Sequence, residues 1–186
     1  MEEVEHKISV LEGAKQALLE KDSFLLKQVS NQTVHSASLH QDAGSLITAT
    51  LVYALSKLVE RKDYVKIKNW DKLVEKINFD FTSAIRAAME GDEEKFNSFL
   101  KKAREALEES SVDMKQYIQD VLRKASINKA SRIYEHGISL GQTAQILGLT
   151  SWELAEYAGQ SKSVETRYMQ TINEKSRAKM ALEFFG

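Results

Sequence analysis

AGSLITATLVYALSKLVE, residues 43–60, is the stretch that decides the predicted fold of this chain. Apolar and small residues cover so much of its circumference at helical spacing that little of it can face water. Asp42 precedes the stretch, and aspartate is a preferred N-cap residue. We therefore expect a helix over residues 43–60 that lies centrally among other helices.

The composition favours the same fold class for the whole chain. The 186 residues include no proline, although turns and sheet edges commonly use it, and they are rich in helix-forming residues. No cysteine is present, which excludes disulfides, thiolate catalysis and cysteine-based zinc sites. The net charge of −1 excludes a globally basic nucleic-acid coat but allows local basic patches. The sequence predicts an all-α protein with six to eight helices.

The N-terminal half divides at polar positions. Residues 8–29 carry apolar side chains near helical spacing, and the polar residues 30–33 indicate a break or a second helix start. Asn69 is a suitable N-cap for a further helix, which Gly91 is expected to end.

Two more helices are expected before the C-terminal third. Asp92 begins one of them, and Ser110 or Ser111 caps a long helix that Gly137 closes. We place a helical domain at residues 1–109 and a second module, which begins with this long helix, at residues 110–158.

A helix-turn-helix is predicted at residues 138–157, ISLGQTAQILGLTSWELAEY. Ser139 with Gln142, and Thr150 with Glu153, have the spacing of capping boxes at two helix starts.

A sharp turn is expected between these two helices. Gly148 stands where the first helix must end, because glycine enters the left-handed region at little cost. Ala144, one turn earlier, is small enough for the second helix to cross close by. The spacing matches the helix-turn-helix of DNA-binding proteins, and a tight helical hairpin that serves only packing or protein binding stays open as an alternative.

The second helix of this unit lacks cations, whereas DNA affinity depends largely on Lys and Arg contacts to phosphates. Any duplex binding should therefore be weak and should rely on flanking cations. The candidate nucleic-acid-binding residues are Lys129, Arg132, Gln142, Ser151, Trp152 and Lys162. Trp152 can be either a core anchor or a binding contact.

The run ASRIYEHGISLGQTAQILGLTSWELAEYAG, residues 130–159, resembles the helix-turn-helix of small prokaryotic, especially archaeal, antitoxin-like proteins of the UPF0175 type. The matching landmarks are Tyr134, Gly137, Ile138, Ser139, Leu140, Gly141, Ala144, Gly148, Leu149, Thr150, Trp152 and Glu153. The resemblance implies a regulator or antitoxin, with a toxin ribonuclease of the PIN type as a possible protein partner. It covers 30 to 40 residues, and the N-terminal region matches no family pattern.

Catalytic and metal-binding patterns are scarce. His35, His40 and Asp42 are the only local group of potential ligands, and two residues five apart diverge by about 140° on a helix. No phosphate-binding loop, dinucleotide fingerprint or HExxH motif occurs. We therefore predict a non-enzymatic protein with no catalytic residue, no metal site and no cofactor.

The last segment, residues 159–186, reads as a basic tail that ends in Phe184 and Phe185. Exposed paired aromatics are unfavourable, so this pair should dock on the protein's own helices or on a partner. Because half-site readers usually pair, a homodimer is expected. The N-terminus carries no apolar signal region, and no run reaches the roughly 20 apolar residues of a spanning helix, so a cytoplasmic location without membrane contact is expected.

These features lead to one functional hypothesis and one alternative. The chain is expected to be a small helix-turn-helix regulator or antitoxin-like protein that binds duplex DNA weakly or binds a toxin. The alternative is a helical interaction or scaffold protein whose helix-turn-helix does not bind DNA.

Overall fold

The computed structural model describes residues 2–40 and 43–135, together with Gly141, Ala144, Gln145, Thr150, Trp152 and Ala155. Its helices up to residue 135 are α1 (Glu2–Glu20), α2 (Ser23–His40), α3 (Ala43–Glu60), η1 (Asp63–Lys66, a 3-10 helix), α4 (Trp70–Glu90), α5 (Glu93–Glu108) and α6 (Lys115–Glu135). Strands are absent from these residues, which confirms the all-α class for this part of the chain. None of the described helices is both long and apolar enough to cross a membrane.

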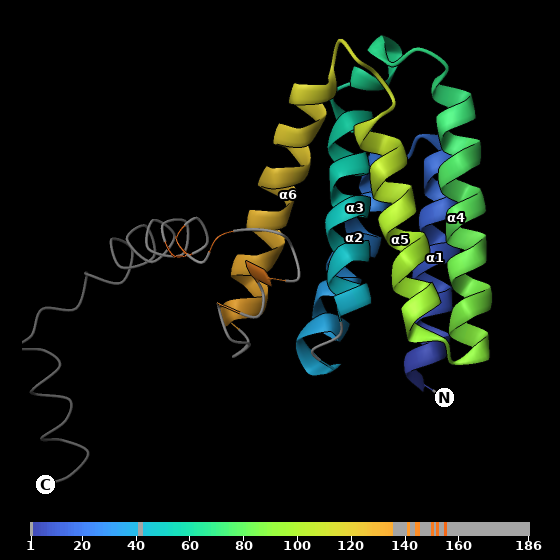
Figure 1. Cartoon of the computed structure of the whole chain (residues 1–186), viewed down its shortest axis with the longest axis vertical. Coiled ribbons are helices and arrows are strands. Elements are labelled where there is room, and N and C mark those ends of the chain that lie inside the picture. The colour runs from blue at the N-terminus through green and yellow to red at the C-terminus, as the bar shows by residue number, and fades with distance from the viewer. Residues whose placement is uncertain are drawn as a thin grey trace, which may run out of the picture.

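Helix α3 occupies the centre of the bundle (Figure 1). It contacts α1, α2, α5, α6 and η1. Around it, α1 packs against α2 and α4, and α4 pairs with α5, while α6 lies on the outside against α3 and α2. The central position predicted for residues 43–60 is confirmed.

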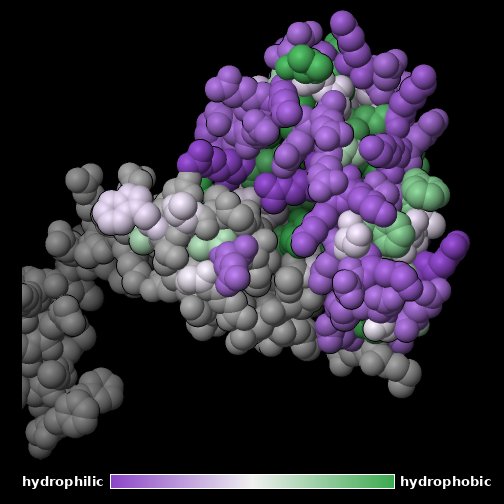
Figure 2. Space-filling model, in the orientation of Figure 1, coloured by the Kyte–Doolittle hydropathy of each residue, from purple (hydrophilic) through white to green (hydrophobic). Residues whose placement is uncertain are grey.

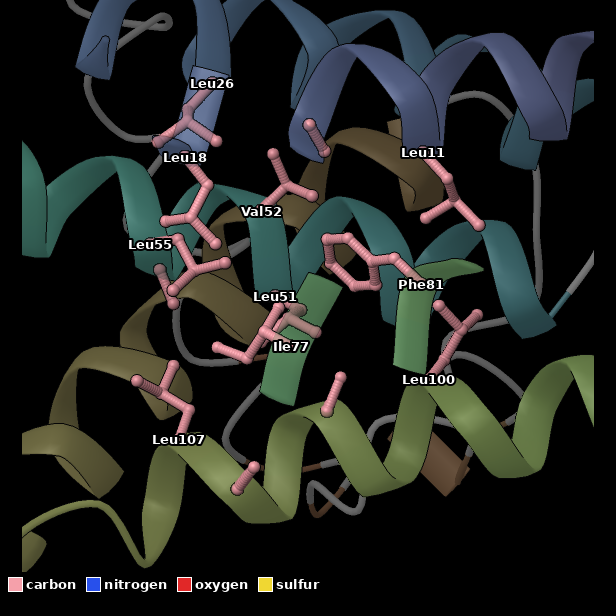
Figure 3. Packing of buried hydrophobic residues seen from close by; sticks show 14 of the residues in the cluster. Leu11, Leu18, Leu26, Leu51, Val52, Leu55, Ile77, Phe81, Leu100 and Leu107 are labelled. Atoms are coloured by element: carbon pink, nitrogen blue, oxygen red, sulfur yellow. The ribbon is translucent and has the colours of Figure 1, made fainter. Parts of the chain in front are cut away.

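The core of the described residues is built from apolar stripes of α1 to α6. Figure 3 shows its middle, where fully buried side chains of α1, α2, α3, α4 and α5 meet: Leu11, Leu18, Leu26, Leu51, Val52, Leu55, Ile77, Phe81, Leu100 and Leu107. Burying one such side chain contributes about 1.5–3 kcal/mol. Ile118, Val121, Leu122 and Ala125 of α6 belong to the same core. The first part of α6 therefore shares the core of the helices before residue 109.

The first helix break lies at Lys21 and Asp22. Lys21 adopts a left-handed conformation with φ of 54°, and Asp22 Oδ1 accepts a hydrogen bond from the Leu25 amide at 2.9 Å. This aspartate is therefore the N-cap of α2.

The break predicted at residues 30–33 was wrong, because α2 runs through them. Ser30 and Thr33 are buried, and their hydroxyls donate to the carbonyl oxygens of Ala49 and Val29 at 2.7 and 2.8 Å. Polar side chains that satisfy themselves in this way remain compatible with a helix interior.

The connection from α4 to α5 follows the prediction. Gly91 ends α4 with φ of 73°, and Asp92 accepts from the Lys95 amide at 2.9 Å at the start of α5. Asn69 precedes α4 as expected, but its φ is 59° and its side chain makes no capping hydrogen bond.

The start of α6 differs from the prediction. Ser110 and Ser111 do not cap it, because α6 begins at Lys115. Ser110 Oγ instead donates to the Leu107 carbonyl at 2.7 Å and so belongs to the end of α5. The predicted cap Asp42 and the predicted helix end Gly137 lie outside the described residues.

Candidate functional site

A groove of about 500 Å³ runs between α3 and α6, within the size range of small-molecule sites. In Figure 1 these two helices lie side by side. The groove is lined by Tyr53, Lys57, Arg61, Tyr117, Asp120, Val121, Lys124, Ala125, Ile127 and Asn128.

Helical periodicity explains why these residues meet. Tyr53, Lys57 and Arg61 are spaced by four residues, so they follow one another along one face of α3 and the turn after it. On α6, Tyr117, Val121 and Lys124 recur at intervals of four and three, and they form the opposite wall. The groove thus combines charged and polar side chains with the apolar surface of Val121, Ala125 and Ile127.

A hydrogen-bond network anchors one end of the groove. Tyr117 Oη donates to Asp63 Oδ2 at 2.5 Å, and Arg61 Nη1 donates to Tyr117 Oη at 3.3 Å. Lys66 Nζ lies 2.9 Å from Asp63 Oδ1. Burial raises the pKa of Asp63, but the hydrogen bonds from Tyr117 and Lys66 outweigh it and hold the pKa below its ordinary value. The carboxylate is therefore ionised and ties η1 to α6.

Two ammonium groups lie near the Tyr53 ring. Lys57 Nζ is 5.4 Å and Lys129 Nζ is 4.2 Å from its centroid, both within cation–π range. Lys129 is fully buried, and its Nζ also donates to Asn31 Oδ1 at 2.9 Å. Its predicted role as a phosphate contact on duplex DNA does not fit this placement, because the buried ammonium cannot reach a phosphate backbone without opening α6 from α2 and α3.

The groove lining carries a net charge of +2, from Lys57, Arg61 and Lys124 against Asp120. Lys57 is paired with Glu60 at 2.6 Å. Lys124 is exposed and forms no hydrogen bond or ion pair with the described residues. The lining is therefore cationic although the whole chain has a net charge of −1.

The predicted helix-turn-helix is described at six positions only. Gly141, Ala144 and Gln145 are helical, Thr150 is in no regular element, and Trp152 and Ala155 are helical again. Ala144 is buried, whereas Trp152 is 79% exposed. At this position Trp152 is thus a surface residue and not a core anchor.

The other residues of the sequence-based sites cannot be placed. Gln142, Ser151, Lys162, Phe184 and Phe185 lie outside the described residues, as does the side chain of Arg132, whose backbone is part of α6.

The histidines considered as ligands give no metal centre in the described part of the chain. The side chains of His35 and His40 lie outside it. Among the side chains that the structure describes, no three His, Asp or Glu residues come together at metal-binding distance. A second hollow, beside His6 and Lys7, has a volume of only about 10 Å³ and accommodates at most one water.

The groove residues were missed by the sequence reasoning. The four-residue spacing of Tyr53, Lys57 and Arg61 was a usable signal, because it places two cations and an aromatic ring in one row. No local pattern, however, indicates that α6 rather than another helix covers this row.

Comparisons of the chain with protein-family models, curated proteins and solved structures found no match.

Proposed function

We propose that this chain is a non-catalytic helix-turn-helix protein of regulator or antitoxin type that acts by binding a partner protein through Trp152. The observation that carries the proposal is the exposure of this side chain, at 79%. Tryptophan is enriched among the residues that dominate protein interfaces.

The charge of the surrounding segment supports a protein partner over duplex DNA. Residues 151–156 contain Glu153 and Glu156 and no Lys or Arg, so they supply no cation to pair with a phosphate. Lys129, one of the flanking cations, is buried. A toxin ribonuclease of the PIN type, which the antitoxin resemblance implies, is the partner class to test first.

Binding of duplex DNA is the second candidate function. It is supported by the helical state of Ala144 and Trp152 on either side of the non-helical Thr150, and by the burial of Ala144, both expected for a helix-turn-helix. In this reading Trp152 lies near the start of the second helix, where base contacts are commonly made.

Affinity purification of the full chain from its native cells, followed by quantitative mass spectrometry, tests the first candidate. We expect a partner that is retained by the wild type and lost with Trp152→Ala. Phe79→Ala is a matched control, because Phe79 is also an exposed aromatic, at 68%, but lies on α4. If both variants retain the same proteins as the wild type, the role of Trp152 in protein binding is wrong.

Fluorescence anisotropy with a mixed-sequence duplex at low and moderate salt tests the second candidate. Salt-dependent binding that Trp152→Ala weakens would favour DNA. Absence of binding at low salt would leave the protein-partner proposal.

A further inference from the structure

We propose that the groove between α3 and α6 binds a nucleoside monophosphate. This ligand site is independent of the partner contact proposed at Trp152. It rests on the size, charge and lining of the groove.

The charge of the groove fits a phosphate monoester. Lys57 and Arg61 stand on the α3 wall and Lys124 on the α6 wall, so an anion between the helices is attracted from both sides. A phosphate monoester carries about −1.5 to −2 charges at neutral pH, and the three cations of the lining outnumber its single carboxylate, Asp120. The guanidinium of Arg61 can in addition donate two parallel hydrogen bonds to phosphate oxygens.

The remaining lining fits an organic body of nucleotide size. A volume of about 500 Å³ is far larger than a bare phosphate requires. Val121 and Ala125 give apolar surface, and the half-buried rings of Tyr53 and Tyr117 provide aromatic surface beside it. Asn128 adds an amide to the same lining.

Contacts among the lining residues position the two tyrosine rings of the groove. Tyr117 is fixed by Asp63 and Arg61, and Tyr53 lies beside the ammonium groups of Lys57 and Lys129. Lys124 is the exception, since no contact with the described residues occupies it. Its ammonium can therefore turn to a phosphate without breaking a pair with any described residue. Elsewhere, the face seen in Figure 2 is mostly hydrophilic, with hydrophobic residues in small separate areas.

Isothermal titration calorimetry of the full chain tests the proposal. The probes are the four ribonucleoside 5′-monophosphates, adenosine and inorganic phosphate, at low and moderate salt. We expect at least one monophosphate to bind about tenfold or more tightly than either adenosine or inorganic phosphate, and its affinity to fall with salt. Lys124→Gln should weaken this binding about tenfold, equivalent to 1.4 kcal/mol.

Lys101→Gln is the matched control, because Lys101 is an exposed lysine on α5 that does not line the groove. It should leave binding unchanged. Equal loss with Lys101→Gln and Lys124→Gln would mean attraction to overall charge and would overturn the assignment.

Three other outcomes would also overturn it. The first is no binding of any monophosphate. The second is inorganic phosphate binding as tightly as the best nucleotide. The third is a hexaglutamate peptide binding more tightly than the nucleotides, which would identify the groove as a site for acidic peptides.

Discussion

Tyr117 Oη donates a hydrogen bond to Asp63 Oδ2 at 2.5 Å, and this bond joins residues 54 positions apart in the sequence. It links α6 to the short helix η1, which follows the central helix α3. Because Asp63 is buried and accepts from Lys66 as well, its carboxylate has a partner for each oxygen. The pair thereby fixes the end of the groove at which Arg61 stands.

Replacing Tyr117 with Phe removes this hydrogen bond and leaves the ring in place. We expect the free energy of unfolding to fall by about 1–3 kcal/mol at pH 7, because a buried carboxylate loses a donor. Urea titration followed by circular dichroism measures the change.

The effect of Tyr117→Phe should depend on pH in a defined direction. The pKa of Asp63 in the folded chain is below its ordinary value, so its stabilising contribution is present above that value. The contribution is lost as the pH falls through the folded pKa. The difference between wild type and Tyr117→Phe should therefore shrink in acid, and a difference that grows there would contradict the assignment.

The contribution of Asp80 to stability should depend on pH in the opposite direction to that of Asp63. Its side chain is buried on α4, and its Oδ2 has no hydrogen-bond partner among the described residues. Burial raises its pKa, and the charges of Lys76 and Lys102 offset this only in part. Its favourable contribution is thus present below the ordinary pKa and is lost as the pH rises through the folded pKa.

At pH 7 the free energy of unfolding of Asp80→Asn should accordingly exceed that of the wild type by on the order of 1 kcal/mol. The two proteins should converge towards pH 4. Urea titrations at several pH values measure both effects, and a variant that is less stable at every pH would contradict the role of burial.

Gly44 permits a close approach between α3 and α5. A Cβ atom at this position would lie 2.5 Å from Phe96 Cε1 and 2.6 Å from Asn97 Oδ1. Gly44→Ala should lower the free energy of unfolding by about 1–3 kcal/mol, because overpacking outweighs the better helix propensity of alanine.

Gly13→Ala is the matched helical control. Its added Cβ would meet Val29 Cγ2 at 3.3 Å, a contact that a small shift can relieve. In thermal unfolding, Gly44→Ala should therefore melt below Gly13→Ala. The reverse order would mean that α5 moves aside without cost.

Lys129 should contribute to stability and not to nucleic-acid binding. Lys129→Ala removes buried packing and the hydrogen bond to Asn31, so we expect a loss of about 2–3 kcal/mol. Lys129→Met keeps most of the volume without a buried charge and should stay within about 1 kcal/mol of the wild type. Denaturant titration measures both. Unchanged stability of Lys129→Ala together with weaker duplex binding would restore its predicted phosphate role.

The elements that could be predicted from the sequence are those whose signals are local. The apolar surface of residues 43–60 indicated a central helix, and Gly91 with Asp92 marked a turn by residue type alone. The turn at Lys21 was not predicted, because lysine, unlike glycine, does not indicate a left-handed conformation. At Ser30 the opposite error occurred, because a break was predicted where the helix continues. The Ser30 hydroxyl donates to a backbone carbonyl of the next helix, α3.

The groove could not be predicted for a related reason. The row formed by Tyr53, Lys57 and Arg61 is visible in the sequence, but its opposite wall depends on where α6 packs. That position depends on long-range contacts such as the one between Tyr117 and Asp63.

The turns at Lys21–Asp22 and Gly91–Asp92 have the same construction, a left-handed residue followed by an aspartate N-cap. The first turn brings α1 against α2, and the second brings α4 against α5. Contacts between such sequence neighbours form quickly, because little loop-closure entropy is lost. The packing of α1 against α4 closes a much longer loop. These two hairpins are therefore expected to form before α1 docks onto α4. Substitutions at the α1–α4 contact should accordingly slow folding less than they speed unfolding.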